Sequence, residues 1–418
     1  MLRRDFSTLC LGLVGAACTR GASGRGSNLL QLVVRTQPFG GDPAPLDALY
    51  AAFERAHPGV KVVRQTLPNA SDVAHQYFLT ALEGGAADFD LFVADVVWIH
   101  EFARAGWIAD LSAAFPPERM ARDFLRSTAE SAVFRGKTFA VPYYADVGLL
   151  YYRRDLVPSP PTTYAALEEA VLEARVQDRS MQGYLWQGKQ YEGLVCNAFE
   201  AVWGHGGTPA SGETLTVASP EAAAGLETLR GWVERGVSPR SVTSAAEEDT
   251  RRAFQQGSAV FQRNWPYAWA EMQKEDSPVC GRVGVAPLPT LAGEPGAGTL
   301  GGYQLAVNAH SPPEKRALVT ALLAHLTSPD AYLTYALHYG RNPPMRSVYQ
   351  DPRLRKGAPF TASLLPHLER ARARPLTPYY NLISDALQGE FSAAVAGLRS
   401  PKEALARAQR RIDHLTKG

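Results

Sequence analysis

The sequence predicts an α/β protein in which helices cover a parallel sheet, and three neighbouring segments are the basis for this prediction. The apolar run LLQLVVRT (29–36) has the length and composition of a buried strand. The amphipathic run LDALYAAFERAHPGV (46–60) indicates a helix that ends at Pro58 and Gly59. The run KVVRQTL (61–67) indicates a second strand. Strand, helix and strand in this order form a βαβ unit, which implies parallel pairing.

The same pattern repeats directly afterwards. HQYFLTALEGG (75–85) predicts a helix, DLFVADVVW (90–98) a strand and IHEFARAGW (99–107) another helix. Open sheets of this class bind ligands at the carboxyl ends of their strands. Asp42 follows the first predicted strand, and Asp95 lies in the carboxyl-terminal half of the strand predicted over 90–98. We expect both at a ligand site, with helix capping as the alternative for each.

The first residues have the pattern of an export signal. MLRRDFSTLCLGLVGAAC (1–18) combines a basic head, a short apolar run and a small-residue approach to Cys18. GAAC resembles the lipobox of bacterial lipoproteins, which predicts an acylated Cys18, a flexible tether over 19–27 and a membrane-anchored protein in the periplasm or at the cell surface. Ordinary cleavage and an uncleaved anchor are the alternatives. The choice between the general secretory and twin-arginine routes stays open.

Composition excludes several classes of function. The hydrophobic share of 45% in 418 residues is enough for two domain cores, and the net charge of +2, spread along the chain, argues against nucleic acid as a partner. After the signal, only Cys196 and Cys280 remain, too few for a thiolate metal site. Two separate buried thiols are the preferred interpretation, and one disulfide is the alternative. HExxH, P-loop and GxSxG patterns are absent from the sequence, so we expect no metal, cofactor or catalysis.

Seven segments in fixed order resemble the extracellular solute-binding proteins of bacterial sugar ABC transporters, most closely the trehalose/maltose-binding branch. They are HPGVKV, DLFVADVVWIHEFARAGWIADL, FAVPYYADVGLLYYRRDL, GYLWQGKQYEGLVCNAFEAVWGHGG, AVFQRNWPYAWA, LGGYQLAVNAHS and RARPLTPYYNLISDAL. The resemblance implies a monomer with the type II, Venus-flytrap fold of periplasmic binding proteins, in which two α/β lobes close on a ligand. It also implies delivery of the sugar to permease subunits.

The family fold also predicts how the chain divides between the lobes. FAVPYY, VGVAPLPTLAG and HYGRNPP are rich in Pro or Gly where the chain is expected to cross, and proline stiffens a crossing while removing a ladder donor. Lobe one is then expected to contain residues 28–141 and 289–338. Lobe two is expected to contain residues 142–288 and 339–418.

Two aromatic segments carry the chemistry of sugar recognition. A sugar presents hydroxyl groups, which carboxylates accept, and ring faces, on which aromatic side chains stack. Tyr144 and Asp146 follow the first crossing, and we expect both to bind ligand, with hinge packing and a turn cap as the alternatives. Trp265 and Tyr267 flank Pro266 in a predicted loop, and similar proteins carry a stacking tryptophan there.

Five further residues complete the predicted site. Gly301 and Gly302 precede a strand where a ligand can approach the backbone, although turn geometry alone also explains them. Tyr303 stands where similar proteins often have tryptophan, and Arg374 matches a family arginine whose alternative is a surface ion pair. Tyr191 in WQGKQYEG is the fifth.

The identity of the sugar is left open by one departure from the family pattern. Some similar trehalose/maltose binders carry an arginine where this chain has Ala74 and His75. Two other functions use related features. An exported glycoside hydrolase would use Asp146 with Asp95 or Glu192, and a sensor would present bound sugar to a signalling partner.

Overall fold

The first three strands and the helices between them form the predicted βαβ units. The computed structural model describes residues 29–67, 71–211 and 214–416. Strands β1 (Leu30–Thr36), β2 (Val60–Thr66) and β3 (Leu91–Asp95) alternate with helices α1 (Ala44–Ala56) and α2 (Ser71–Glu83), and α3 (Ile99–Ala105) follows. Strand β1 pairs in parallel with β2 and with β3. The predicted α/β class is therefore confirmed.

Two antiparallel strands complete the first sheet, whose order is β2-β1-β3-β13-β6. They are β6 (Ala140–Val147) and β13 (Leu300–Val307), and β13 lies between β3 and β6. The pairing of β13 with β6 shifts register beside Pro142, which lacks the N–H that a regular ladder needs. Other elements of this half are α4 (Pro117–Asp123), α5 (Arg126–Ala132), β4 (Val133–Phe134), β5 (Lys137–Thr138), α11 (Arg316–Leu326) and α12 (Pro329–Tyr339).

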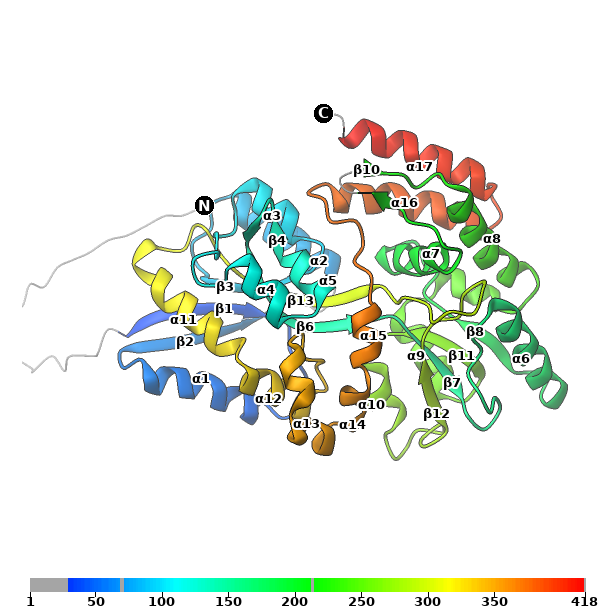
Figure 1. Cartoon of the computed structure of the whole chain (residues 1–418), viewed down its shortest axis with the longest axis horizontal. Helices are drawn as coiled ribbons and strands as arrows, with labels where there is room; N and C mark the ends of the chain where they lie inside the picture. Colours follow the sequence, from blue (N-terminus) through cyan, green and yellow to red (C-terminus); the bar gives the residue numbers. More distant parts are fainter. Residues whose placement is uncertain (1–28, 68–70, 212–213, 417–418) are drawn as a thin grey trace, which may run out of the picture.

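A second sheet has the order β12-β7-β11-β8. Its strands are β7 (Leu149–Arg153), β8 (Gln182–Leu185), β11 (Ala259–Asn264) and β12 (Val283–Ala286). Figure 1 shows this sheet and its helices as a separate half of the molecule. These helices are α6 (Tyr164–Gln177), α7 (Glu192–Gly204), α8 (Pro220–Glu234), α9 (Glu247–Gln255), α10 (Ala268–Met272), α16 (Tyr380–Val395) and α17 (Pro401–Thr416), beside the short pair β9 (Ala210–Ser211) and β10 (Thr214–Leu215).

The predicted division of the chain between lobes stays a proposal, and the strand pairing favours two changes to it. Strand β6 pairs with β13 as far as Val147, so the first crossing is better placed at Gly148 than at residue 141. Asn342 bridges to Ala145, and Met345 bridges to Phe124. Helices α13 (Pro352–Gly357), α14 (Pro359–Ser363) and α15 (Leu365–Arg370) continue from there, α13 against α12 and α15 against β6. Residues 340–370 therefore fit the first lobe better than the second.

The remaining predictions on the ends of the chain and on its thiols have different outcomes. Cys18, the predicted signal (1–18) and the tether (19–27) lie outside the described residues. Cys196 and Cys280 are both free. Cys196 is buried as predicted, whereas the predicted burial of Cys280 is wrong, because it lies exposed in the loop between α10 and β12. Among the helices that the structure describes, none is both long and apolar enough to cross a membrane.

Candidate functional site

Strand register brings five candidate residues to one end of the first sheet. Asp95 ends β3 and lies opposite Tyr303 of β13, which lies opposite Tyr144 of β6. Gly301 lies opposite Asp146 by the same register. The rings of Tyr144 and Tyr303 have their centroids 5.4 Å apart. Two carboxylates and two phenol rings thus gather at the carboxyl end of β3, which is where an α/β sheet offers its ligand site.

Both carboxyl groups of this cluster are held in a poorly hydrated environment. Burial raises the pKa of Asp95, and the guanidinium of Arg374 opposes that rise. Burial also raises the pKa of Asp146, and Arg341 and the amide of Asn342 oppose it. Asn342 Nδ2 donates to Asp146 Oδ1 at 3.2 Å. In such surroundings a carboxylate gains more from accepting a hydroxyl hydrogen bond than it would in water.

Arg374 links this cluster to the other half of the molecule. It comes from the segment before α16 and is 4% exposed. Its guanidinium donates to Glu192 Oε1 on α7 at 2.8 Å, and to Asp95 Oδ1 and the carbonyl of Leu300 at 3.4 and 3.3 Å. The surface ion pair that was the alternative for Arg374 is therefore not what the structure has. The two terminal nitrogen atoms of its guanidinium already donate to acceptors in the protein.

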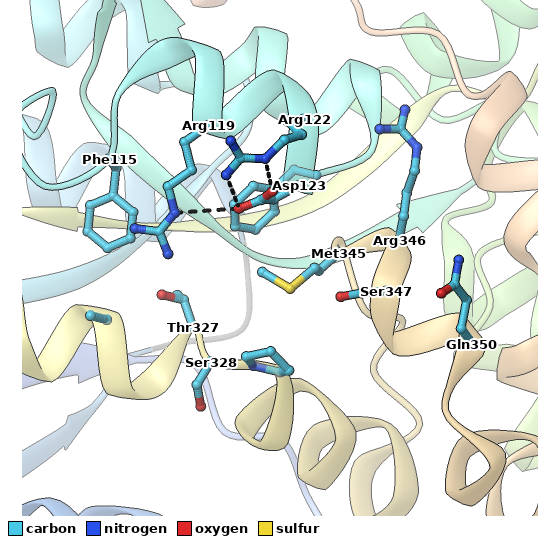
Figure 2. Close-up of a pocket in the computed structure, with 13 residues that line it drawn as sticks. Phe115, Arg119, Arg122, Asp123, Thr327, Ser328, Met345, Arg346, Ser347 and Gln350 are labelled. Atoms are coloured by element: carbon cyan, nitrogen blue, oxygen red, sulfur yellow. Dashed lines mark hydrogen bonds and ion pairs between the residues drawn. The ribbon is translucent and has the colours of Figure 1, made fainter.

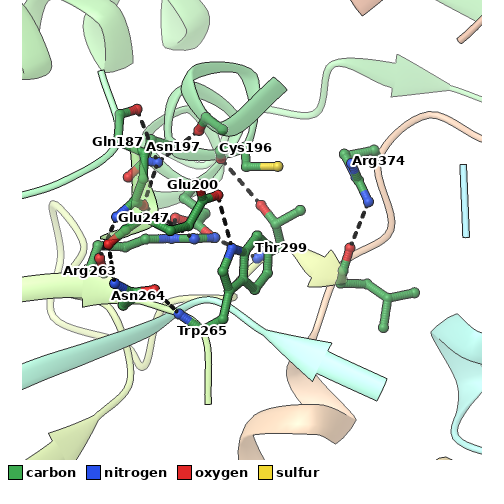
Figure 3. Close-up of polar contacts among 12 residues, drawn as sticks. Gln187, Cys196, Asn197, Glu200, Glu247, Arg263, Asn264, Trp265, Thr299 and Arg374 are labelled. Atoms are coloured by element: carbon green, nitrogen blue, oxygen red, sulfur yellow. Dashed lines mark hydrogen bonds and ion pairs between the residues drawn. The ribbon is translucent and has the colours of Figure 1, made fainter. Parts of the chain in front are cut away.

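Trp265 has one face against a buried cation. It follows β11 directly, and its ring centroid lies 4.0 Å from the guanidinium carbon of Arg263. Its indole N–H donates to Glu247 Oε1 at 3.3 Å, as Figure 3 shows. A Cβ added to Gly301 would lie 3.0 Å from the ring. The orientation of Trp265 is thus fixed by three neighbours before any ligand binds, which reduces the entropic cost of stacking.

The hydroxyl groups of the two other candidate tyrosines, Tyr191 and Tyr267, donate hydrogen bonds to different glutamates. Tyr191 donates to Glu247 Oε2 at 2.7 Å, so Glu247 holds both Tyr191 and Trp265. Tyr267 donates instead to Glu248 Oε1 at 2.9 Å, at an exposed position. Both acceptors lie at the start of α9, but only Tyr191 shares its acceptor, Glu247, with Trp265.

The paired glycines are explained by packing within the protein. Gly302 has φ +98°, and a Cβ there would lie 2.3 Å from the carbonyl oxygen of Tyr144. Gly301 leaves room for the ring of Trp265 and the Cβ of Asp146. Gly302 needs glycine so that β13 can approach β6, whether or not a ligand also contacts it. At Gly301 an added Cβ would be in tight contact with the ring of Trp265.

Asp42 lies apart from this group. It is exposed, its Oδ1 accepts from the N–H of Ala44 at the start of α1, and its carbonyl accepts from Tyr339. The contact with Ala44 lies at the start of α1, but the N-cap residue of α1 is Pro43 and not Asp42, which was the capping alternative.

Two charged residues that sequence reasoning missed contact the predicted site. Glu247 begins α9 within the polar run EEDTRR, which has the composition of a solvated helix. Arg341 lies in the predicted crossing HYGRNPP, whose Gly and Pro residues indicate a turn and give no sign of a ligand contact. Both reach the site through tertiary packing, which local sequence does not encode.

Contacts between the halves also occur beyond Arg374. His75 Nε2 and Glu101 Oε2 are 2.9 Å apart, and Asn381 of α16 contacts both side chains. Arg104 lies over the ring of Tyr379, 4.4 Å from its centroid. His75, near the position where the expected arginine is missing, is therefore part of the contact between α2, α3 and α16.

One of the larger cavities is lined by a candidate residue, Arg374, and another is lined by none. Arg374 lines a cavity of about 780 Å³ beside Trp203, Arg126 and the segment 369–376. Figure 2 shows another, of about 540 Å³, where Arg119 and Arg122 contact Asp123; none of the candidate residues lines it. Within the described part of the chain, no three His, Cys, Asp or Glu side chains are arranged to hold a metal ion.

Comparison with known proteins adds a family to this geometry. The sequence profile of the bacterial extracellular solute-binding proteins matches residues 40–332. A protein of Deinococcus radiodurans named as a probable ABC transporter-binding protein is 36% identical over 82% of this chain and 83% of its own length. The structure of maltose-bound MalE3 of T. maritima superposes with a TM-score of 0.82, at 35% identity, over 92% of this chain and 100% of that one.

A more distant structure supports the fold alone. It is an ABC transporter solute-binding protein of Agrobacterium radiobacter K84 in complex with ribitol. It is 22% identical, has a TM-score of 0.78, and covers 92% of this chain and 98% of its own. The predicted two-lobed binding-protein fold is confirmed by these matches.

Proposed function

Because the chain belongs to the bacterial extracellular solute-binding proteins, we propose that it binds an α-linked glucose disaccharide, maltose or trehalose, between its lobes. The coarser function is that of an exported, non-catalytic substrate-binding component of a sugar ABC importer, whose partners are a sugar and the membrane permease. The disaccharide, hinge closure, a monomeric state and anchoring through acylated Cys18 belong to our proposal.

The observation that carries the proposal is the gathering of Asp95, Asp146, Tyr144 and Tyr303 near a pre-oriented Trp265. Carboxylates supply acceptors for sugar hydroxyls, and an aromatic face stacks on a pyranose ring. We propose these residues, with Gly301, Arg374 and Tyr191, as the binding site. The 35% identity to a maltose-bound protein supports a disaccharide ligand over a polyol.

Calorimetry on the purified protein tests this function. The panel contains maltose, trehalose, sucrose, glucose, ribitol and mannitol, with spermidine as a control for other binder classes. We expect maltose or trehalose to bind best, and small-angle scattering to show a smaller radius of gyration at saturation, as hinge closure requires. If ribitol or mannitol binds tightly while neither maltose nor trehalose binds, the disaccharide assignment is refuted.

A sensor that presents its sugar to a signalling partner would show the same binding. The permease partner is therefore tested separately, by reconstitution with a sugar ABC permease of the same organism. Sugar-dependent stimulation of its ATPase is expected.

A further inference from the structure

Arg341 is held at the candidate site by its neighbour in the chain. The backbone carbonyl of Asn342 accepts from the N–H of Ala145 at 3.0 Å, and Asn342 Nδ2 donates to the carbonyl of Ala145 at 3.0 Å. Asn342 is completely buried, so this attachment is rigid. The segment after α12 is thereby fixed to β6 at Ala145, between Tyr144 and Asp146.

The guanidinium of Arg341 lies over two aromatic rings. Its central carbon is 4.8 Å from the centroid of Tyr144 and 4.9 Å from that of Phe39. Such contacts attract the cation through the negative ring faces, but they use none of its N–H groups as hydrogen-bond donors. The donors of Arg341 therefore stay available in the plane of the guanidinium.

Arg341 differs in this respect from the other two arginines near the site. Arg263 donates to Glu200 at 2.9 Å, and Arg374 donates to Glu192 at 2.8 Å. For Arg341, no carboxylate lies within ion-pair distance among the described residues, and its buried Nε has no hydrogen-bond partner there. The buried Nε of Arg374 also lacks a partner, but the other two nitrogen atoms of Arg374 donate to protein acceptors. A buried guanidinium donor without a partner is costly, so that of Arg341 points to a ligand acceptor.

We propose that Arg341 is a specificity-determining residue that donates hydrogen bonds to neighbouring hydroxyl groups of the bound sugar, while Asp146 accepts from the same sugar. This inference rests on the proposed function. The planar fork of arginine matches two adjacent oxygen atoms.

A neutral sugar fits this assignment better than an acidic one. Asp95, Asp146, Glu192 and Glu247 contribute four carboxylates to the site, whereas the guanidinium groups within it are those of Arg374 and Arg341, with Arg263 paired to Glu200 below. A carboxylate on the ligand would add to this excess of negative charge.

Arg341→Met and Arg341→Lys test the proposal, with Arg355→Met on the exposed surface of α13 as the matched control. Calorimetry measures the Kd of maltose and trehalose, and of analogues that each lack one hydroxyl group. We expect Arg341→Met to weaken the better disaccharide roughly 10–100-fold, the range for a hydrogen bond to a charged group. Arg341→Lys keeps the charge without the fork and should lose part of the affinity, and Arg355→Met none.

The deoxy analogues separate recognition from a structural role. In the parent protein, removal of a hydroxyl that Arg341 contacts should weaken binding, whereas in Arg341→Met the same removal should have little further effect. If Arg341→Met does not fold, Arg341→Lys carries this comparison. Equal penalties for every analogue in parent and variant would overturn the inference and leave the proposed function intact. If the parent protein binds neither disaccharide, both the inference on Arg341 and the proposed function are wrong.

Discussion

The buried ion pair beneath Trp265 allows a prediction that needs no knowledge of the ligand. Arg263 is 0% exposed, and Glu200 is 8% exposed. Arg263 donates through Nε to Glu200 Oε2 at 2.9 Å, and the other carboxylate oxygen accepts from the N–H of Thr299 at 2.8 Å. Replacement of Arg263 by Met therefore leaves an uncompensated carboxylate inside the second lobe.

Removal of one partner of a buried pair costs about 3–5 kcal/mol of unfolding free energy. For a domain of roughly 150–250 residues this corresponds to a fall in Tm of roughly 6–20 °C. Glu200→Gln alone keeps an acceptor for Thr299 but leaves Arg263 without a counter-charge. The double variant Arg263→Met/Glu200→Gln contains no buried charge at this place, so we expect it to be more stable than either single variant.

Thermal unfolding followed by circular dichroism measures the four proteins side by side. Arg230→Met serves as control, because Arg230 pairs with Glu234 on the surface of α8, where the loss should be below about 1 kcal/mol. Penalties that simply add in the double variant would show that the two charges are not coupled, and the reasoning on the support of Trp265 would then be wrong.

Three other perturbations address the site. Trp265→Ala removes a buried aromatic contact, so the binding free energy of the sugar that the parent protein binds should weaken by about 2–4 kcal/mol. Calorimetry measures this change, and an unchanged Kd would exclude stacking. Gly302→Ala should lower Tm by more than Gly40→Ala, since both have positive φ but only the former would bring a Cβ within 2.3 Å of a backbone oxygen. Burial raises the pKa of Asp146 in the folded protein, so its charged form costs stability above that pKa, and the cost disappears as pH falls towards the unfolded value of about 3.9. Asp146→Asn should accordingly raise Tm at pH 7 and lose this advantage near pH 4; a constant difference would contradict the assignment.

Sequence periodicity was sufficient for the first lobe's βαβ units, because strand and helix patterns are local. It also placed Asp95 in a strand predicted over 90–98, whereas β3 ends at Asp95 itself. The strand pairing favours a later first crossing than the one proposed from Pro142, because β6 continues past this proline through a shift in register. The roles of Glu247 and Arg341 depend on residues distant in the chain, so no local pattern reveals them.

The contacts between the lobes separate affinity from specificity. Asn381 contacts Glu101 and His75, and Arg104 lies over the ring of Tyr379. These contacts are made between protein side chains and do not involve a ligand. They therefore contribute to the free energy of the arrangement in which the lobes touch. If a sugar binds that arrangement alone, its apparent Kd is the intrinsic value divided by the fraction of protein already so arranged. Asn381→Ala should then raise the Kd of every sugar by one common factor. A substitution of a residue that contacts hydroxyl groups should instead raise the Kd of some sugars more than that of others.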